Sequence, residues 1–151
     1  MEVLIADQGW LSACPPAEAL VEEAARAALV GMPGGTVSIL LTGDAEQQRL
    51  NRMYRGKDAA TNVLAFPLDG HTPDEAPRLL GDVALACETI AREAAEQNKP
   101  VADHLRHLVV HGVLHLLGFD HESEADATMM EAREVEILHG LGVPDPYRNT
   151  I

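Results

Sequence analysis

The sequence predicts a single α+β domain with a small mixed sheet packed by about five helices. Helical amphipathic segments and short aliphatic runs both occur, and they do not alternate strictly along the chain. The length of 151 residues suits one domain with a sizeable core. Since 46% of the residues are hydrophobic and 3% aromatic, that core should consist mainly of Leu, Val, Ile and Ala. No repeat or linker-like tract divides the chain, so residues 1–151 are assigned to one domain.

Turn residues and caps delimit the elements of the N-terminal half. Pro15 and Pro16 suit the start of a helix, because proline lacks the N–H that a first turn leaves unpaired. Asp44, followed three residues later by Gln47, resembles a capping box. The expected elements are a strand at 2–6, a helix from Pro15 to near Gly31, a strand at 36–41 and a helix from Asp44 to Gly56.

The C-terminal half is predicted to be mostly helical. The polar stretch 69–77, DGHTPDEAP, is expected to be a loop between two strands. Ser123 with Asp126 caps the last helix, whose segment MMEAREVEIL carries an apolar stripe. The expected elements are strands at 62–66 and 80–86, and helices at 87–98, at 102–117 and from Ser123 to Gly140.

Composition excludes several classes of protein. No uncharged apolar run reaches membrane-spanning length, and the N-terminus lacks a secretory signal, so a cytoplasmic protein is expected. Cys14 and Cys87 are too few and too isolated for a disulfide framework or a cysteine-based zinc site, and are expected to be buried or idle thiols. The formal net charge of -13 argues against general nucleic-acid affinity, and no DNA binding is expected.

Basic residues are nevertheless concentrated in one segment. Four of the eleven fall in RLNRMYRGK, namely Arg49, Arg52, Arg55 and Lys57. Such a run is either a solvated helix face or a local phosphate-binding patch, and charge alone leaves both open.

The strongest motif is HGVLHLLGFDH, with histidines at His111, His115 and His121. On a helix, His111 and His115 project in the same direction about 6 Å apart and can reach one ion. Gly118 is expected to end the helix in a left-handed conformation and return the chain, so that His121 supplies a third nitrogen. Three imidazoles suit one Zn²⁺ per chain and leave a position for water, whose pKa zinc lowers to about 7. A hydrolytic site is predicted.

The spacing matches the metzincin pattern HExxHxxGxxH, except that Gly112 replaces the glutamate that acts as general base. Peptide hydrolysis is therefore less favoured, although Asp120 or Glu122 would be a substitute base. Phosphodiester cleavage is favoured, because a metal ion with a neighbouring cation can drive it. Asp120 would either orient a ligand histidine or cap a turn.

Other histidines and methionines near this motif have weaker interpretations. His104 is too far along the helix to share the ion with His115. His107 is placed either behind the ligands, in contact with one of them, or at the rim of the site. Met129 and Met130 are expected to fill the core.

The chain resembles the YbeY family of bacterial endoribonucleases and rRNA maturation factors. HGVLHLLGFDH matches every fixed position of the family's H-G-x-L-H-L-x-G-[YF]-D-H, and LNRMYRGKDAATNVLAFPL resembles its LNxxYRxxDxxTDVLSFP. LLGDVALA is similar to its LGDIxIS strand. Asn62 stands where Asp is common, and Ala65 replaces a serine.

The resemblance implies a zincin-like α+β fold, zinc held by His111, His115 and His121, and cleavage of single-stranded RNA. It implies work in 16S rRNA 3′-end maturation and ribosome quality control, with ribosomal or assembly proteins as partners. It also gives Arg55 a functional role, so Arg55 and His111 are the expected catalytic residues. The alternatives are a metallohydrolase acting on a peptide or small molecule, and a non-catalytic assembly factor in which zinc organises the fold.

Overall fold

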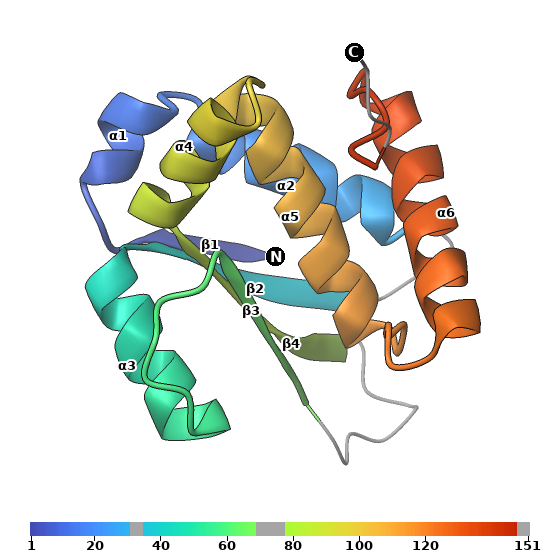
Figure 1. Cartoon of the computed structure of the whole chain (residues 1–151), viewed down its shortest axis with the longest axis horizontal. Helices are drawn as coiled ribbons and strands as arrows, with labels where there is room; N and C mark the ends of the chain where they lie inside the picture. Colours follow the sequence, from blue (N-terminus) through green and yellow to red (C-terminus); the bar gives the residue numbers. More distant parts are fainter. Residues whose placement is uncertain (31–34, 69–77, 148–151) are drawn as a thin grey trace.

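A computed structural model of the chain describes residues 1–30, 35–68 and 78–147 (Figure 1). The strands are β1 (Glu2–Ile5), β2 (Gly35–Thr42), β3 (Val63–Pro67) and β4 (Arg78–Ala86). The helices are α1 (Gly9–Ala13), α2 (Ala17–Ala28), α3 (Asp44–Arg55), α4 (Cys87–Glu96), α5 (Val101–Leu116) and α6 (Glu124–Gly140). The expected loop 69–77, including His71, lies outside the described residues.

The four strands form one mixed sheet in the order β1-β2-β4-β3. β1 pairs with β2 and β2 with β4 in parallel, whereas β3 runs antiparallel to β4 at the edge. This arrangement confirms the predicted α+β class with a small mixed sheet. The helices of the described ranges include α1, a five-residue helix that the sequence did not predict.

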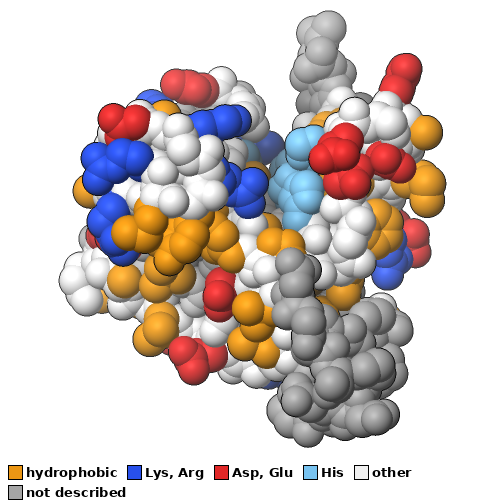
Figure 2. All heavy atoms as spheres, turned by 90° about the horizontal axis from the view of Figure 1, so that it is seen from below, with side chains coloured by type: hydrophobic (Ala, Val, Ile, Leu, Met, Phe, Trp, Pro, Cys, Tyr) orange, Lys and Arg blue, Asp and Glu red, His pale blue; other side chains and the backbone are white. Residues whose placement is uncertain are grey.

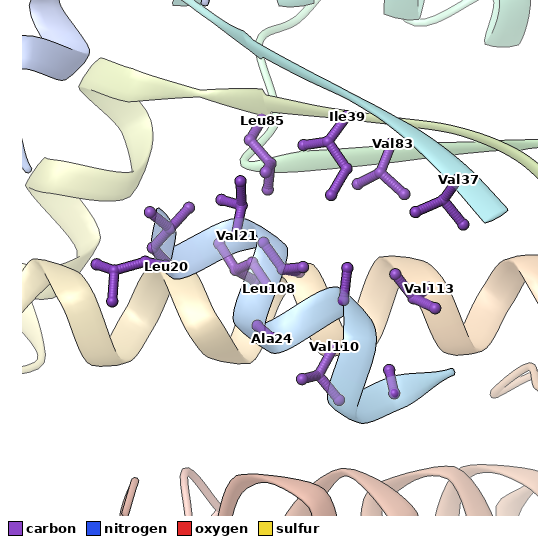
Figure 3. Close-up of a cluster of buried hydrophobic side chains, with 14 of the residues drawn as sticks. Leu20, Val21, Ala24, Val37, Ile39, Val83, Leu85, Leu108, Val110 and Val113 are labelled. Atoms are coloured by element: carbon purple, nitrogen blue, oxygen red, sulfur yellow. The ribbon is translucent and has the colours of Figure 1, made fainter. Parts of the chain in front are cut away.

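Helices α2 and α5 cover one face of the sheet, and the core lies between that face and the two helices (Figure 3). Ile39 and Leu85 alternate with outward-facing residues on their strands and pack against Val21 and Leu108 from the two helices. The cluster is mostly aliphatic, and Trp10 is the one aromatic residue among its buried, described members; its indole Nε1 donates to the carbonyl of Thr42. Both cysteines are free and buried, as expected.

The opposite face of the sheet carries α3 alone among the described helices (Figure 1). Gln47 on α3 is fully buried, and its amide donates to the carbonyl of Ala84 on β4 at 2.9 Å. The helix therefore packs on one part of this face by a polar contact and leaves the rest open.

The predicted capping box at Asp44 is wrong. Gly43 is the N-cap, and the Gln47 side chain is used on the sheet. Asp44 instead accepts from the backbone N–H and hydroxyl of Thr89 on α4, while Glu88 accepts from the Asp44 N–H. Two helix N-termini thus cap each other, a long-range arrangement that a local pattern cannot reveal.

The final helix agrees with its predicted cap but not with every predicted core residue. Ser123 Oγ accepts from the Asp126 N–H at 3.0 Å, as expected. Met130 is 2% exposed and belongs to the core, whereas Met129 is 64% exposed, so the prediction of a core role for Met129 is wrong. Within the described ranges, none of the helices has the length and hydropathy needed to cross a membrane.

Candidate metal centre

Helix α5 carries the first two histidines of the motif on one face. His111 and His115 are one turn apart, and their Nε2 atoms approach to 3.1 Å. The helix holds this geometry firmly, because its other faces are buried against α2, β3 and β4.

After α5 the chain turns back at Gly118, as the sequence predicts. Gly118 has φ +100, a left-handed conformation that L side chains rarely adopt. Its N–H donates to the carbonyl of His115, and the Phe119 N–H donates to that of Leu114, which is the Schellman pattern of a helix C-terminus. This turn places His121 beside the two helical histidines.

The three predicted ligands form one cluster. One nitrogen from each of His111, His115 and His121 lies within 4.8 Å of the others. Tetrahedral zinc with Zn–N bonds of about 2.0–2.1 Å requires ligand nitrogens about 3.3 Å apart, close to the 3.1 Å between the helical pair. The donor set therefore fits zinc.

A buried carboxylate orients one of these imidazoles, and the sequence analysis missed it. Glu134 on α6 is fully buried, and its Oε1 lies 2.5 Å from Nδ1 of His111. Since a carboxylate accepts the Nδ1 proton, the lone pair of His111 is left on Nε2, the atom that faces His115. The signal was present in the sequence: Glu134 lies in the apolar stripe, four residues from both Met130 and Leu138.

The second oxygen of Glu134 is also held. The hydroxyl of Tyr147, beyond the end of α6, donates to Oε2, and His107 Nε2 lies 3.6 Å from it. Burial alone would raise the pKa of Glu134, but its contacts with His107, His111 and Tyr147 outweigh burial and lower the pKa to about 2. Glu134 is therefore a carboxylate at neutral pH. His107 therefore contacts Glu134, the residue that orients His111, and does not join the three clustered histidines.

Burial lowers the pKa of His115, and the neighbouring His111 and His121 lower it further. Neutral imidazole is the form that binds a metal ion. The environment of His115 thus favours the state that ligation requires.

Of the two interpretations left open for Asp120, the structure shows the turn. Its Oδ1 accepts from the backbone N–H of Glu122 at 3.3 Å, and Glu134 occupies the orienting position instead. His104 points elsewhere: it is 3% exposed, and its Nε2 lies 2.8 Å from Glu93 of α4.

Gly112 packs against the sheet. A Cβ there would lie 2.8 Å from Cγ1 of Val83 and 3.4 Å from Cγ2 of Val63. This position is therefore filled by strand side chains, and the catalytic glutamate of the metzincin pattern has no room here without a shift of α5.

Arg55 and the histidines line the same cavity, which has a volume of about 680 Å³. Arg55 ends α3, and its Nη2 donates to the carbonyl of Ala65 on β3 at 2.6 Å. The guanidinium also lies over the ring of Phe66, 5.8 Å from its centroid. These contacts fix a cation on the wall of the cavity that holds the metal ligands.

The four basic residues of RLNRMYRGK have two different surroundings, one typical of a solvated helix face and the other of a phosphate-binding patch. Arg49 pairs with Glu46, and Arg52 with Asp58, as on a solvated helix face. Arg55 and Lys57 line the cavity and have no carboxylate partner among the described residues. Figure 2 shows basic and hydrophobic side chains side by side on one lobe, with histidines exposed in the hollow next to it.

Comparison with known proteins identifies the family. Residues 15–142 match the family model described as Endoribonuclease YbeY. Proteins named Endoribonuclease YbeY from Rhodopseudomonas palustris and Azorhizobium caulinodans are each 49% identical over 97% of this chain, and the alignments cover 90% and 95% of those proteins. The solution structure of TM1509 from Thermotoga maritima has a TM-score of 0.59 at 25% identity and covers 98% of this chain and 99% of its own. The chain belongs to the YbeY endoribonuclease family.

Proposed function

We propose that this protein is a zinc-dependent endoribonuclease that cleaves single-stranded RNA. The observation that carries the proposal is a single cavity lined by three metal-ligand imidazoles and the Arg55 guanidinium. The names of the relatives support RNA as the substrate class.

The residues of the cavity have separate tasks. Zinc held by His111, His115 and His121 would supply Lewis acidity and lower the pKa of a coordinated water. Arg55 stabilises the negative charge that develops on the phosphate. Its Nη2 is fixed by Ala65, and the guanidinium, which has five N–H donors, retains others for phosphate oxygens.

We further propose that the substrate is rRNA, with roles in 16S rRNA 3′-end maturation and ribosome quality control in the cytoplasm. The net charge of -13 predicts weak, salt-sensitive binding to free RNA, because few cations offset the repulsion of phosphates. Ribosomal or assembly proteins would then deliver the substrate.

The other enzyme class considered, a peptidase, lacks its base at the usual position, because Gly112 is packed on Val83. Asp120 and Glu122 line the cavity and are the carboxylates such an activity would require. Peptide substrates therefore belong in the assay as a negative control.

The role of Arg55 is tested by Arg55→Ala, with Arg52→Ala as the matched control. Both are arginines in the last turn of α3, but the Arg52 side chain is 64% exposed and is absent from the cavity wall. Arg55→Ala should lower the cleavage rate by roughly 100- to 1,000-fold with bound zinc unchanged, the usual effect of removing a donor to developing charge. Arg52→Ala should cut RNA at the parental rate. Equal cleavage by Arg55→Ala and the parent would refute the role given to Arg55.

A further inference from the structure

An aromatic pair, one ring exposed and the other half-buried, lies next to the cavity of the candidate metal centre. Tyr54 in the last turn of α3 and Phe66 on β3 meet edge to face, with ring centroids 5.4 Å apart. Tyr54 is 65% exposed. The chain has five aromatic residues, and the other three have structural partners: Trp10 is fully buried, Phe119 packs against the core, and Tyr147, although 46% exposed, donates its hydroxyl to Glu134.

The pair borders a second cavity that adjoins the first. It has a volume of about 740 Å³ and lies over the part of the sheet that α3 leaves open. Arg55, Ala65 and Pro67 line both cavities, so a ligand that crosses Arg55 passes from one to the other. Figure 2 shows hydrophobic side chains gathered beside the basic ones on the lobe that faces the histidines.

Positive and negative side chains lie at different parts of the second cavity. Arg55 stands at the border with the metal centre, while Glu2 and Asp82 line the part formed by β1 and β4. Carboxylates repel phosphates but do not repel an uncharged base. A nucleic-acid strand would therefore keep its phosphates on the Arg55 side and turn a base toward the sheet.

We infer that Tyr54, supported by Phe66 and Arg55, is a stacking site for one unpaired nucleobase of the RNA strand. The inference rests on the proposed function, since Arg55 would then hold a phosphate beside the stacked base. Aromatic rings bind bases of any sequence by their π faces. A base in a duplex already stacks on both sides, so this site also gives a physical reason for the single-strand preference.

Equilibrium binding tests the site separately from cleavage. Zinc-loaded, full-length protein is titrated into a short labelled single-stranded RNA, and anisotropy is read at low temperature with a gel to confirm that the RNA is uncut. Tyr54→Ala should weaken binding by roughly 5- to 150-fold, the usual loss for one base stack. Tyr54→Phe should bind as the parent does, whereas Tyr54→Leu, which is apolar but has no π face, should resemble Tyr54→Ala.

The matched control is Met53→Ala, since Met53 is the neighbouring residue on α3, is 59% exposed and lines neither cavity. It should leave RNA binding unchanged. A set of RNAs with one abasic nucleotide at successive positions adds a second test. At one position the missing base should weaken binding to the parent and should have no effect on Tyr54→Ala.

The outcomes separate the two proposals. Metal-dependent cleavage with parental RNA binding by Tyr54→Ala would refute the stacking site and leave the nuclease standing. Tyr54-dependent RNA binding without cleavage would support the site and refute the nuclease. Parental binding by Tyr54→Leu would also refute stacking, and would indicate an apolar surface for a protein partner.

Discussion

Glu134 determines which nitrogen of His111 is available to a metal ion. Its carboxylate is fully buried and takes the Nδ1 side of the imidazole, while Tyr147 holds its other oxygen. Removing such an orienting partner usually weakens metal binding by 10- to 100-fold.

Glu134→Gln should therefore bind zinc roughly 10- to 100-fold more weakly than the parent, measured by competition with a chromophoric chelator. Glu136→Gln is the matched control, since Glu136 lies on the same helix with a side chain 73% exposed and paired to Arg133. Unchanged zinc affinity in a folded Glu134→Gln protein would show that the carboxylate does not tune His111.

His104 makes the stability of the fold depend on pH. Burial lowers its pKa, and this effect outweighs the contact with Glu93. Its Nδ1 is buried without a hydrogen-bond partner in the described part of the chain, so a proton there would be unsatisfied. The unfolded chain takes up this proton near pH 6.5, whereas the folded chain does so only at lower pH.

As pH falls below about 6.5, the unfolded state binds more protons at His104 than the folded state does. The free energy of unfolding therefore falls with pH in this range. His104→Gln keeps a donor for Glu93 but cannot titrate. Urea unfolding of the variant should show a shallower loss of stability between about pH 7 and pH 5, with a difference below about 1.4 kcal/mol per pH unit. Identical slopes for parent and variant would contradict this account.

At the residue scale, the sequence was enough to predict which three histidines would meet, but not which carboxylate would lie against one of them. The spacing of His111, His115 and His121 follows from helix geometry and one glycine, and the structure brings all three together. The sequence offers Asp120, next to His121, as a carboxylate that could orient a ligand histidine. The orienting carboxylate comes instead from α6, and only the packing of α5 against α6 makes Glu134 a neighbour of His111.

At the level of elements, the close approach of α5 to the sheet depends on Gly112. Val83 is buried and branched at Cβ, so it cannot move aside easily for a Cβ at position 112. Gly112→Ala should gain about 1 kcal/mol in helix propensity but lose about 1–3 kcal/mol from overpacking. The expected net result is a loss of about 1 kcal/mol in the free energy of unfolding.

Gly140→Ala provides the control for this prediction. Gly140 ends α6, and a Cβ there would meet no atom of the described residues within 4 Å. This variant should be more stable than the parent by up to about 1 kcal/mol, measured by the same chemical denaturation. A Gly112→Ala protein that gains stability as Gly140→Ala does would show that α5 has room at the sheet.

The elements themselves were predictable where the pattern is local. The strands and the five longer helices follow hydrophobic periodicity, and Ser123 caps α6 as its sequence suggests. The capping box at Asp44 failed because its side chains serve other partners: Asp44 caps α4 and Gln47 bonds to β4. Helix α1 has five residues, too few to show a periodicity.

For the whole molecule, the fold class was predictable but the order of strands was not. Placing β4 between β2 and β3 is a tertiary choice that brings the end of α3 and the edge strand β3 to the same cavity as α5. The cavity therefore combines residues from distant segments: Arg55 from the end of α3, and the histidines from α5 and the turn after it. An acidic chain thereby presents a local cation beside a three-histidine cluster that could hold a metal ion.

The central claim, that the three-histidine cluster makes this chain a metal-dependent ribonuclease, is tested most directly by cleavage of single-stranded RNA. Four nuclease-free samples are compared: the parent, the zinc-stripped parent, the stripped parent with zinc restored, and His111→Ala, each checked for folding by circular dichroism. We expect cleavage by the parent, its loss on stripping, recovery with zinc, and none by His111→Ala. Cleavage by folded His111→Ala at the parental rate, or no cleavage by the folded, zinc-loaded parent, would contradict the claim.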